Sequence, residues 1–409
     1  KDMFWYIAWR NVWRNKLRSL VVIMATAIGL SGSLFMIALM NGMMQQKVDA
    51  TIENEISEMQ IHNPKFLEDE SVQYHIDEPE RIVNYLKNDD RVQSFSLRVK
   101  ATGMASTAHS GNGVMINGIR PEQEKEVSAI SNKVYAGTYF ENQSRIPSIV
   151  ISKELAEHLQ VEVGKKVVLT TTALNGETIQ SLFRVEGLYR TSNKMFDEMN
   201  VFILGPELQK MVGSDDHIVS EIAIRFTDNT DIDEVQAHMQ DKFPDLSILS
   251  WKELAPSLMA ILGMMDQFAY ILILIILIAL VFIIVNVMLM VIIERTRELG
   301  MLMAIGMNRG KVFRMIMLET VFMSVTGAAI GVLLTIITVR LTNNIGINFA
   351  AWSEGFEAFG YSAHVYPVIE TAFYFFLGIM VILAAMLASV WPARKALKLQ
   401  PAEAVREET

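Results

Sequence analysis

Residue types that could bind a nucleotide or a metal ion do not stand at the spacings that such sites need. Gly310 and Lys311 form the pair that ends a phosphate-binding loop, but no glycine lies five residues before Gly310 and Val312 follows the lysine. The seven histidines lack the H-E-x-x-H spacing of a zinc site, and the serines and aspartates form no nucleophile motif. The sequence therefore predicts no catalytic residue, no metal site and no cofactor bound by this chain.

One segment, residues 294–306, has a spacing that suits contact with a partner protein. Charged side chains stand at its start and an apolar run follows them. A short amphipathic helix of this kind can dock into a groove on another protein. The alternative is a basic tether on the cytoplasmic side of a membrane, and composition alone leaves both open. The candidate contact residues are Arg295, Arg297, Glu298, Gly300, Ala304 and Gly306.

Long apolar runs on both sides of this segment predict membrane-spanning helices, because about 20 helical residues cross the hydrocarbon layer. The runs cover residues 20–40, 268–293, 320–339 and 371–391. The first run is longer than the apolar part of a signal peptide, and no small-residue cleavage site follows it. We interpret it as a retained anchor.

Lysine and arginine mark the cytoplasmic segments of a membrane protein. They gather before the first run, between the second and third, and after the fourth, whereas residues 341–370 contain neither. Near the start of the chain Trp5, Trp9 and Trp13 recur every four residues, which predicts an amphipathic helix in the headgroup layer. Packing of these tryptophans on neighbouring spans is the alternative. Glu319 and Arg340 flank the third run, and we interpret them as boundary residues that reach the membrane surface.

Residues 42–266, between the first two runs, have the composition of a water-exposed domain. They hold 21 Lys and Arg against 35 Asp and Glu, a net charge of −14, which disfavours nucleic-acid binding. Asn175 and Gly176 predict a hairpin turn. Alternating patterns predict strands at 59–61, 94–101, 113–117, 148–151, 167–172, 179–188, 200–203 and 221–226, and helices at 80–87, 153–159, 206–211 and 232–242.

The fold class predicted from these patterns is an α-helical membrane protein with four transmembrane helices and an α+β extracytoplasmic domain inserted between the first and second spans. The predicted parts are an amphipathic interface helix at 1–18, spans at 19–41, 267–293, 316–341 and 368–392, the extracytoplasmic domain with its stalk helices at 42–266, a cytoplasmic helical loop at 294–315, an extracytoplasmic loop at 342–367, and a cytoplasmic tail at 393–409.

Small residues recur every four positions in two of the spans, a pattern that lets helix backbones approach closely. The set in the first span includes Gly29 and Ser33, and the set in the third consists of Gly327 and Gly331. Contact with a second subunit and packing within the chain are both open for the first set.

The segment Arg297-Glu298-x-Gly300-x-x-x-Ala304-x-Gly306 resembles the signature of the FtsX/MacB-type permease superfamily of ABC transporters. In that superfamily this loop is the coupling helix that contacts the ATPase. The tail, with Trp391-Pro392-Ala393-Arg394 and residues 400–406, is similar to the C-terminal signature of the superfamily. Within it the chain is most similar to Lol-type, lipoprotein-releasing transmembrane subunits, on Met40-Asn41-Gly42 and on residues 116–124 and 155–165.

This resemblance implies a non-catalytic subunit of the bacterial inner membrane with its large domain in the periplasm. Its partners would be cytoplasmic ATPase subunits that bind ATP and Mg, and a second permease subunit in a homodimer or heterodimer. The implied function is extraction of a lipoprotein from the outer leaflet, among membrane lipids. Lol-type subunits recruit a periplasmic carrier with an arm, and the corresponding hairpin here, residues 171–181, is shorter. The alternatives are efflux of a peptide or drug, and non-transporting control of a periplasmic hydrolase or sensor.

Extraction of an acyl chain requires an apolar groove that opens outward between the first and second spans. Unbranched methionine adapts to apolar partners of varied shape. Ordinary packing against lipid or another subunit is the alternative for each residue. The candidate groove residues are Met36, Leu39, Met40, Met43, Met264, Met265 and Phe268.

Overall fold

The computed structural model describes residues 9–10, 12–13, 16–141, 145–214, 218–228 and 230–397 of the 409-residue chain. The chain forms two compact units. The helical unit comprises Lys1–Met44, Leu262–Asn348 and His364–Thr409, and the α/β unit comprises Gln45–Ile261 and Phe349–Ala363. The sequence motif of the tail at residues 400–406 lies outside the described residues.

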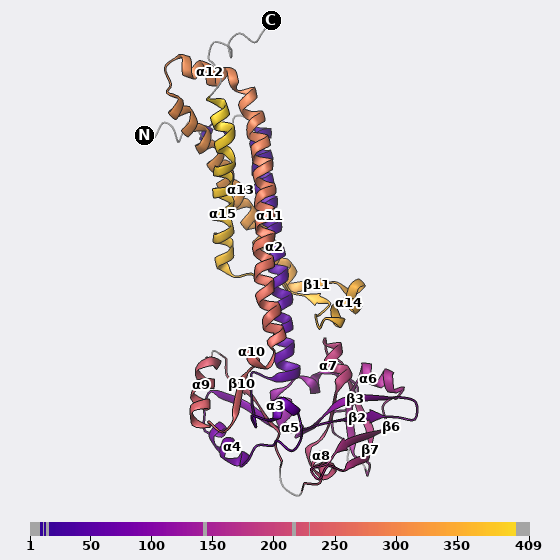
Figure 1. The fold of residues 1–409 in the computed structure, drawn as a ribbon. Helices are drawn as coiled ribbons and strands as arrows, with labels where there is room; N and C mark the ends of the chain where they lie inside the picture. The colour runs from indigo at the N-terminus through magenta and orange to yellow at the C-terminus, as the bar shows by residue number, and fades with distance from the viewer. Residues whose placement is uncertain are drawn as a thin grey trace. The chain divides into compact units, whose positions relative to one another are not determined.

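Four helices of the chain are long and apolar enough to cross a membrane, as the sequence predicts. They are Ser19–Ile56, which joins most of α2 (Lys16–Thr51) to a π-helical turn at Ile52–Ile56, α11 (Pro256–Glu294), α13 (Arg309–Ile345) and α15 (Thr371–Ala396). Figure 1 shows these helices running alongside one another in the helical unit, with the short α12 (Thr296–Ala304) between α11 and α13. They enclose one apolar cluster that includes Leu30, Ile284 and Val381.

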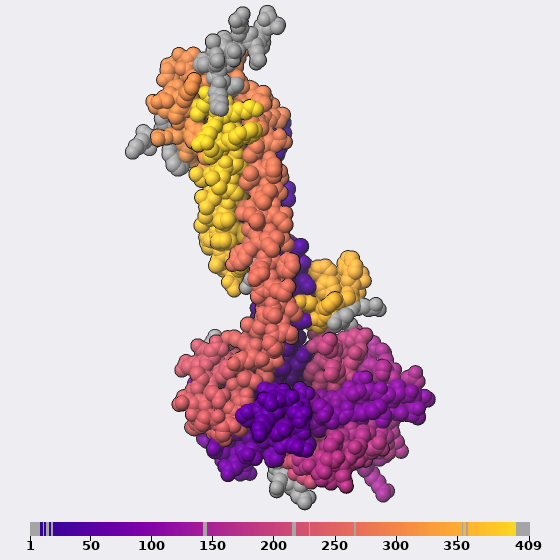
Figure 2. Space-filling model, in the orientation of Figure 1, coloured from indigo at the N-terminus to yellow at the C-terminus, as the bar shows by residue number. Residues whose placement is uncertain are grey.

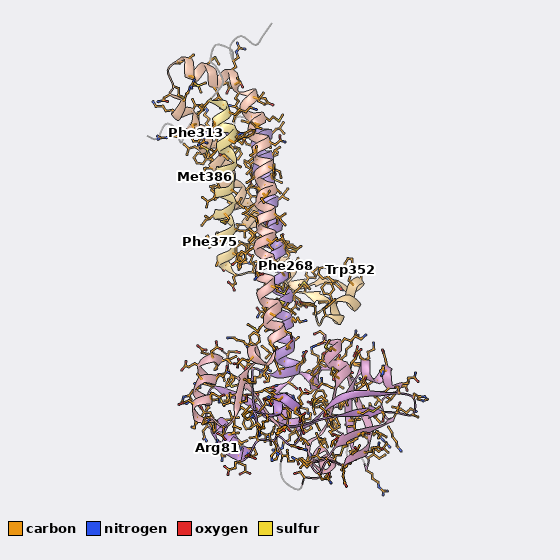
Figure 3. All side chains as sticks on the ribbon, in the orientation of Figure 1. Arg81, Phe268, Phe313, Trp352, Phe375 and Met386 are labelled. Atoms are coloured by element: carbon orange, nitrogen blue, oxygen red, sulfur yellow. The ribbon has the colours of Figure 1, made fainter. Side chains whose placement is uncertain are left out.

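The outer surface of the helical unit keeps many large apolar side chains exposed. Phe268 on α11 is 57% exposed and Phe375 on α15 is 69% exposed, and both are labelled in Figure 3. The space-filling view in Figure 2 shows α11 and α15 as parts of this surface. Apolar side chains on helices of this length are those that the hydrocarbon layer of a bilayer covers.

The described N-terminal tryptophans contact the helical unit. The ring of Trp9 lies edge-on to Phe322 of α13 with 5.5 Å between centroids, and 5.9 Å from the ring of Trp13. Trp9 and Trp13 nevertheless remain 44% and 48% exposed. One face of Trp9 therefore packs on a neighbouring span, which was the alternative to a position in the headgroup layer. Trp5 lies outside the described residues.

The α/β unit is built on a mixed sheet. Its strands are β1 (Met59–His62), β2 (Val92–Ser106), β3 (Gly111–Ile119), β4 (Val134–Gly137), β5 (Ser148–Ser152), β6 (Lys166–Thr172), β7 (Thr178–Tyr189), β8 (Asn200–Leu204), β9 (Glu221–Phe226) and β10 (Ser247–Ser250). The order is β10-β1-β9-β2-β3-β8-β5-β7-β4, with β6 paired to β2 and β7. The β3–β8 and β5–β7 pairs are parallel and the others are antiparallel.

Helices cover the sheet of the α/β unit. They are α3 (Phe66–Asp69), α4 (Pro79–Lys87), α5 (Pro121–Val127), α6 (Lys153–Leu159), α7 (Lys194–Met199), α8 (Gly205–Val212), α9 (Ile232–Lys242) and α10 (Trp251–Leu254), with α14 (Ser353–Ala358) in the segment between α13 and α15. All eight strands and all four helices predicted for residues 42–266 are present. The sequence analysis missed β4 and β10, which are four residues each.

The strand β2 divides the α/β unit into two lobes. Its first part pairs with β9 as far as Arg98, and its second part pairs with β3 from Val99 onward. One apolar cluster lies around β1, β9, α4 and α9, and another around β3, β5, β6 and α8. Figure 1 shows α4 and α9 beside β10, and α8 near β6 and β7.

The predicted hairpin turn joins β6 to β7. Gly176 has a φ of 82°, a left-handed value that favours glycine. The backbone N–H of Leu174 donates to the carbonyl oxygen of Val212 in α8 at 3.0 Å, and Ala173 is buried. The hairpin loop is therefore packed against the domain.

Candidate functional site

The segment from Arg295 to Gly306 forms a distinct helix, α12, between two long ones. Arg295 is the residue before its first turn and has a non-helical φ of −99° and ψ of 9°. The helix ends at Ala304, and Gly306 follows with a φ of 103°. Asn308 then starts α13, because its side chain accepts a hydrogen bond from the backbone N–H of Gly310 at 3.0 Å.

The helix α12 has one buried and one exposed face. Leu299 and Gly300 are buried, and Leu302 and Met303 pack against the apolar cluster of the helical unit. The opposite face consists of Arg297, Met301, Ala304 and Ile305, which are four, three and one positions apart and therefore share one helical face. Met301 is 47% exposed and Ile305 is 86% exposed. This face has the apolar and charged character of a docking surface.

Arg295 connects α12 with α13. Its Nε donates to the Oε2 atom of Glu298 at 3.1 Å, and its Nη1 donates to the Oε2 atom of Glu319 at 2.8 Å. Glu319 is only 5% exposed. Glu319 is therefore buried among the helices, because the guanidinium of Arg295 pairs with its carboxylate, and its position at the membrane boundary stays a prediction.

The candidate coupling residues thus separate into two groups. Arg297, Ala304 and Gly306 are exposed. Arg295 and Gly300 face the helical unit, with Glu298 between the two groups on the edge of α12. The sequence analysis missed two residues of the exposed face, Met301 and Ile305, which the 3.6-residue period from Arg297 onward would have located.

The candidate groove residues lie on partly exposed stripes of α2 and α11. On α2, Met36 is 44% exposed, and Leu39, Met40 and Met43 are half-buried. On α11, Met264 is 56% and Phe268 is 57% exposed, while Met265 is half-buried.

The two stripes lie at one level along the helices. A Cβ atom on Gly29 of α2 would lie 3.2 Å from Cδ1 of Leu280 of α11, and the two helices run in opposite directions. Met40 is eleven residues beyond Gly29, and Phe268 is twelve residues before Leu280. Since each helical residue rises about 1.5 Å, Met40 and Phe268 lie within one turn of each other in height. One turn deeper, Ile37 and Ile273 share the buried cluster.

The small residues of the spans lie at helix contacts within the chain. A Cβ atom on Gly327 would lie 2.8 Å from the carbonyl oxygen of Ile23, and one on Gly331 would lie 2.8 Å from that of Ala27, so α13 approaches α2 closely. Ser33 is buried and donates to the carbonyl oxygen of Gly29 at 2.6 Å. Close approach of two helices within one chain accounts for Gly327 and Gly331.

A further glycine, Gly42, lies where α2 meets the segment before α15. A Cβ atom there would lie 2.1 Å from the carbonyl oxygen of Tyr366. The backbone N–H of Val368 donates to the carbonyl oxygen of Ala38 at 2.9 Å. The Met40-Asn41-Gly42 sequence therefore allows backbone contact at the outer level of the groove stripes.

Two protein-family models match this chain, one in its first part and one in its second. The model of the MacB-like periplasmic core domain matches residues 19–242, more than half of the chain, and the model of the FtsX-like permease C-terminal region matches residues 270–401. The chain is an ABC transporter permease of the FtsX/MacB/Lol family. This family is typically non-catalytic and implies an ATPase partner and a permease dimer. Within the described residues no group of three or more His, Cys, Asp or Glu could hold a metal ion.

Individual relatives of this permease bear two different names. The lipoprotein-releasing system transmembrane protein LolC of Xylella fastidiosa is 22% identical over 306 residues, which cover 72% of this chain and 73% of LolC. The macrolide export ATP-binding/permease protein MacB of Chlorobaculum tepidum is 32% identical over 121 residues, which cover 29% of this chain and 16% of MacB. The crystal structure of the periplasmic region of MacB from Actinobacillus actinomycetemcomitans covers 49% of this chain and 91% of its own, at 13% identity and a TM-score of 0.34.

The apolar helices and the periplasmic-type domain together indicate a membrane protein with an extracytoplasmic domain.

Proposed function

We propose that this permease lies in the bacterial inner membrane and couples ATP hydrolysis by separate ATPase subunits to extraction of lipoproteins from the outer leaflet. In this proposal α12 faces the cytoplasm and the α/β unit faces the periplasm. The extent of the similarity to LolC, 72% of the chain against 29% for MacB, favours release of lipoproteins over efflux of drugs.

The apolar stripes on α2 and α11 carry this proposal. An acyl chain gains about 0.8 kcal/mol for each methylene that leaves water, so a protein that extracts it must offer a continuous apolar surface. Met40 on α2 and Phe268 on α11 supply such surface at one level, and Met36 and Met264 extend it along the two helices. In a single chain Met36, Met264 and Phe268 are exposed, and a second permease subunit, identical or related, would close the groove over them.

The exposed face of α12 is the proposed contact with the ATPase. When two ATPase subunits close on bound ATP, they would move α12 and through it the ends of α11 and α13. The β6–β7 hairpin contacts α8 through the backbone of Leu174, and residues 175–178 at its tip are exposed. A carrier contact at residues 171–181 does not form part of this proposal.

A photo-crosslinking amino acid at Met40 or at Met264 tests the groove in the native membrane. We expect it to capture an acylated protein in the absence of ATP and to lose that product when ATP is added. Met195 provides the matched control, because it is a methionine on α7 of the α/β unit and is 67% exposed. A crosslinker at Met195 should capture no acylated protein.

Charge substitutions sharpen the same experiment. Met40→Asp and Met264→Asp should reduce capture at a crosslinker on the facing stripe, because a carboxylate in an apolar groove is costly to desolvate. Met195→Asp should leave capture unchanged. Crosslinks to soluble peptides or to a partner protein, independent of ATP, would exclude lipoprotein extraction and favour efflux or control of a periplasmic hydrolase or sensor.

A further inference from the structure

Glu319 of α13 is a buried carboxylate among apolar side chains of the helical unit. It is 5% exposed, and the residues around it on α13, among them Met315, Ile316 and Met323, are buried members of the apolar cluster. A carboxylate in such surroundings is stable only when a positive charge and hydrogen-bond donors accompany it. Replacing both members of a buried ion pair by apolar residues of similar volume is often neutral or stabilising, so helix packing alone does not require the pair. Its position therefore points to a role beyond packing.

The partner of Glu319 comes from the start of α12. Arg295 reaches Glu319 with Nη1 at 2.8 Å and Glu298 with Nε at 3.1 Å, and its side chain is 11% exposed. Arg295 stands directly between the last residue of α11 and the first of α12. One guanidinium thus joins the end of α11, the first turn of α12 and the body of α13.

The chain passes from α12 to α13 through the turn at Ile305–Asn308, which contains Gly306 at a φ of 103°. A glycine in this conformation transmits little bending force, since it has the widest choice of backbone angles. The ion pair, in contrast, is short, charge-assisted and shielded from water.

We propose that Glu319 is a coupling residue, which transmits movement of α12 to α13 through Arg295. This inference rests on the proposed contact between α12 and an ATPase, and it concerns the same site. When the ATPase moves α12, the Arg295–Glu319 pair makes α13 follow as one body. Without the pair α12 would swing about the turn at Gly306 while α13 stays behind.

The test compares Glu319→Gln with the native chain in the full complex with its ATPase. The substitution keeps the size of the side chain and removes its charge. The chain contains no cysteine, so Thr296→Cys in the first turn of α12, outside its exposed face, and Ile345→Cys at the far end of α13 give one pair of spin-label sites per subunit. Thr296 is half-buried and Ile345 is 77% exposed. In the native chain we expect the distance between the labels to stay constant when ATP is added, whereas in Glu319→Gln it should change.

Transport provides the second measurement. Glu319→Gln should retain ATPase binding and ATP hydrolysis but lose about tenfold in substrate released per ATP, the size of a typical coupling between sites. Glu319→Asp, which keeps the negative charge beside Arg295, should retain most of the release per ATP. Arg340→Gln, which removes an exposed charge at the other end of α13, should behave as the native chain.

The outcomes separate this inference from the proposed function. If the native chain binds no ATPase, the proposed function and the coupling role fall together. If it binds and responds to ATP while Glu319→Gln gives the same label distances and the same release per ATP, only the coupling role is refuted.

Discussion

Arg98 lies where the two lobes of the α/β unit meet. It is buried, and its guanidinium reaches Glu124 through Nη2 and Glu221 through Nη1, both at 2.6 Å. Burial alone would raise the pKa of Glu221, but Lys100 and Arg98 lower it to about 2. The carboxylate therefore stays charged near neutral pH, and the ion pairs join β2 to β9 and to α5.

His62 makes the stability of this charge cluster depend on pH. Burial lowers its pKa from 6.5 to about 4, although Glu221 opposes that change. The unfolded chain binds a proton at higher pH than the folded chain does, so this stability is fully present above pH 6.5 and is lost as the pH falls toward 4. We expect the free energy of unfolding of the α/β unit to decrease by about 2 kcal/mol between pH 7 and pH 5 from this histidine.

Chemical denaturation of the full chain in detergent at a series of pH values measures this effect. His62→Gln keeps a polar side chain beside Gln60, which lies 2.8 Å from Nε2 of His62, and should flatten the pH dependence. His109 is the matched control, because it is an exposed histidine of the α/β unit and His109→Gln should leave the dependence intact. An unchanged slope in His62→Gln would contradict the assignment.

For single residues, the sequence predicts which segment contacts a partner protein but not which side chains become buried. The spacing from Arg297 to Gly306 located the helix α12, yet it did not separate its two faces. The burial of Glu319 could not be predicted, because its partner Arg295 lies 24 residues away and arrives only when α12 folds back onto α13. His62 carries no motif, and its surroundings come from strands far apart in the chain.

The contact between α13 and α2 depends on glycine at two positions. Any side chain on Gly327 would meet the backbone of α2 at 2.8 Å. We expect Gly327→Val to lower the free energy of unfolding by about 1–3 kcal/mol, since the helices must separate to admit the side chain. Thermal unfolding of the full chain in detergent measures the loss.

A second glycine in a span serves as the control for this substitution. Around Gly378 of α15 no heavy atom lies within 4 Å of an added Cβ atom. Gly378→Val should therefore unfold at nearly the same temperature as the native chain. Equal losses from both substitutions would indicate that helix propensity, rather than contact with α2, determines the effect.

Elements with a clear period could be predicted, and short or interrupted ones could not. Each long apolar run and each alternating strand of more than four residues was located from the sequence. The helix that leads into the second span is interrupted near its start, because α10 ends at Leu254 and α11 begins at Pro256. Proline disfavours a helical conformation in the residue before it, and Ala255 accordingly has a φ of −119° and ψ of 63°.

At the scale of the whole molecule, the proposed topology follows from the distribution of charge. The acidic domain at residues 42–266 and the segment 341–370, which lacks Lys and Arg, are assigned to the periplasm. A reporter enzyme that is active only outside the cytoplasm should be active when inserted after Asn175 and inactive when inserted after Asn308 or at Thr409. Activity of the reporter after Asn308 would overturn the assignment of α12 to the cytoplasm.

In the proposed function, movement of α12 by the ATPase must be transmitted to the apolar stripes on α2 and α11. The helical unit offers continuous packed helices between these sites, with α13 tightly packed against α2 at Gly327 and Gly331. The nature of the substrate, in contrast, is not indicated by any sequence motif that we identify. An apolar stripe has the same composition whether lipid, another subunit or an acyl chain covers it.

Release of an acylated protein from proteoliposomes is the measurement that tests lipoprotein extraction most directly. The permease and its ATPase would be reconstituted with a triacylated lipoprotein and, separately, with the same protein anchored by a transmembrane helix. We expect ATP to release the acylated form, Met40→Asp to reduce the release, and the helix-anchored form to stay in the membrane. ATP hydrolysis without release of the acylated form, or equal release of both forms, would contradict lipoprotein extraction.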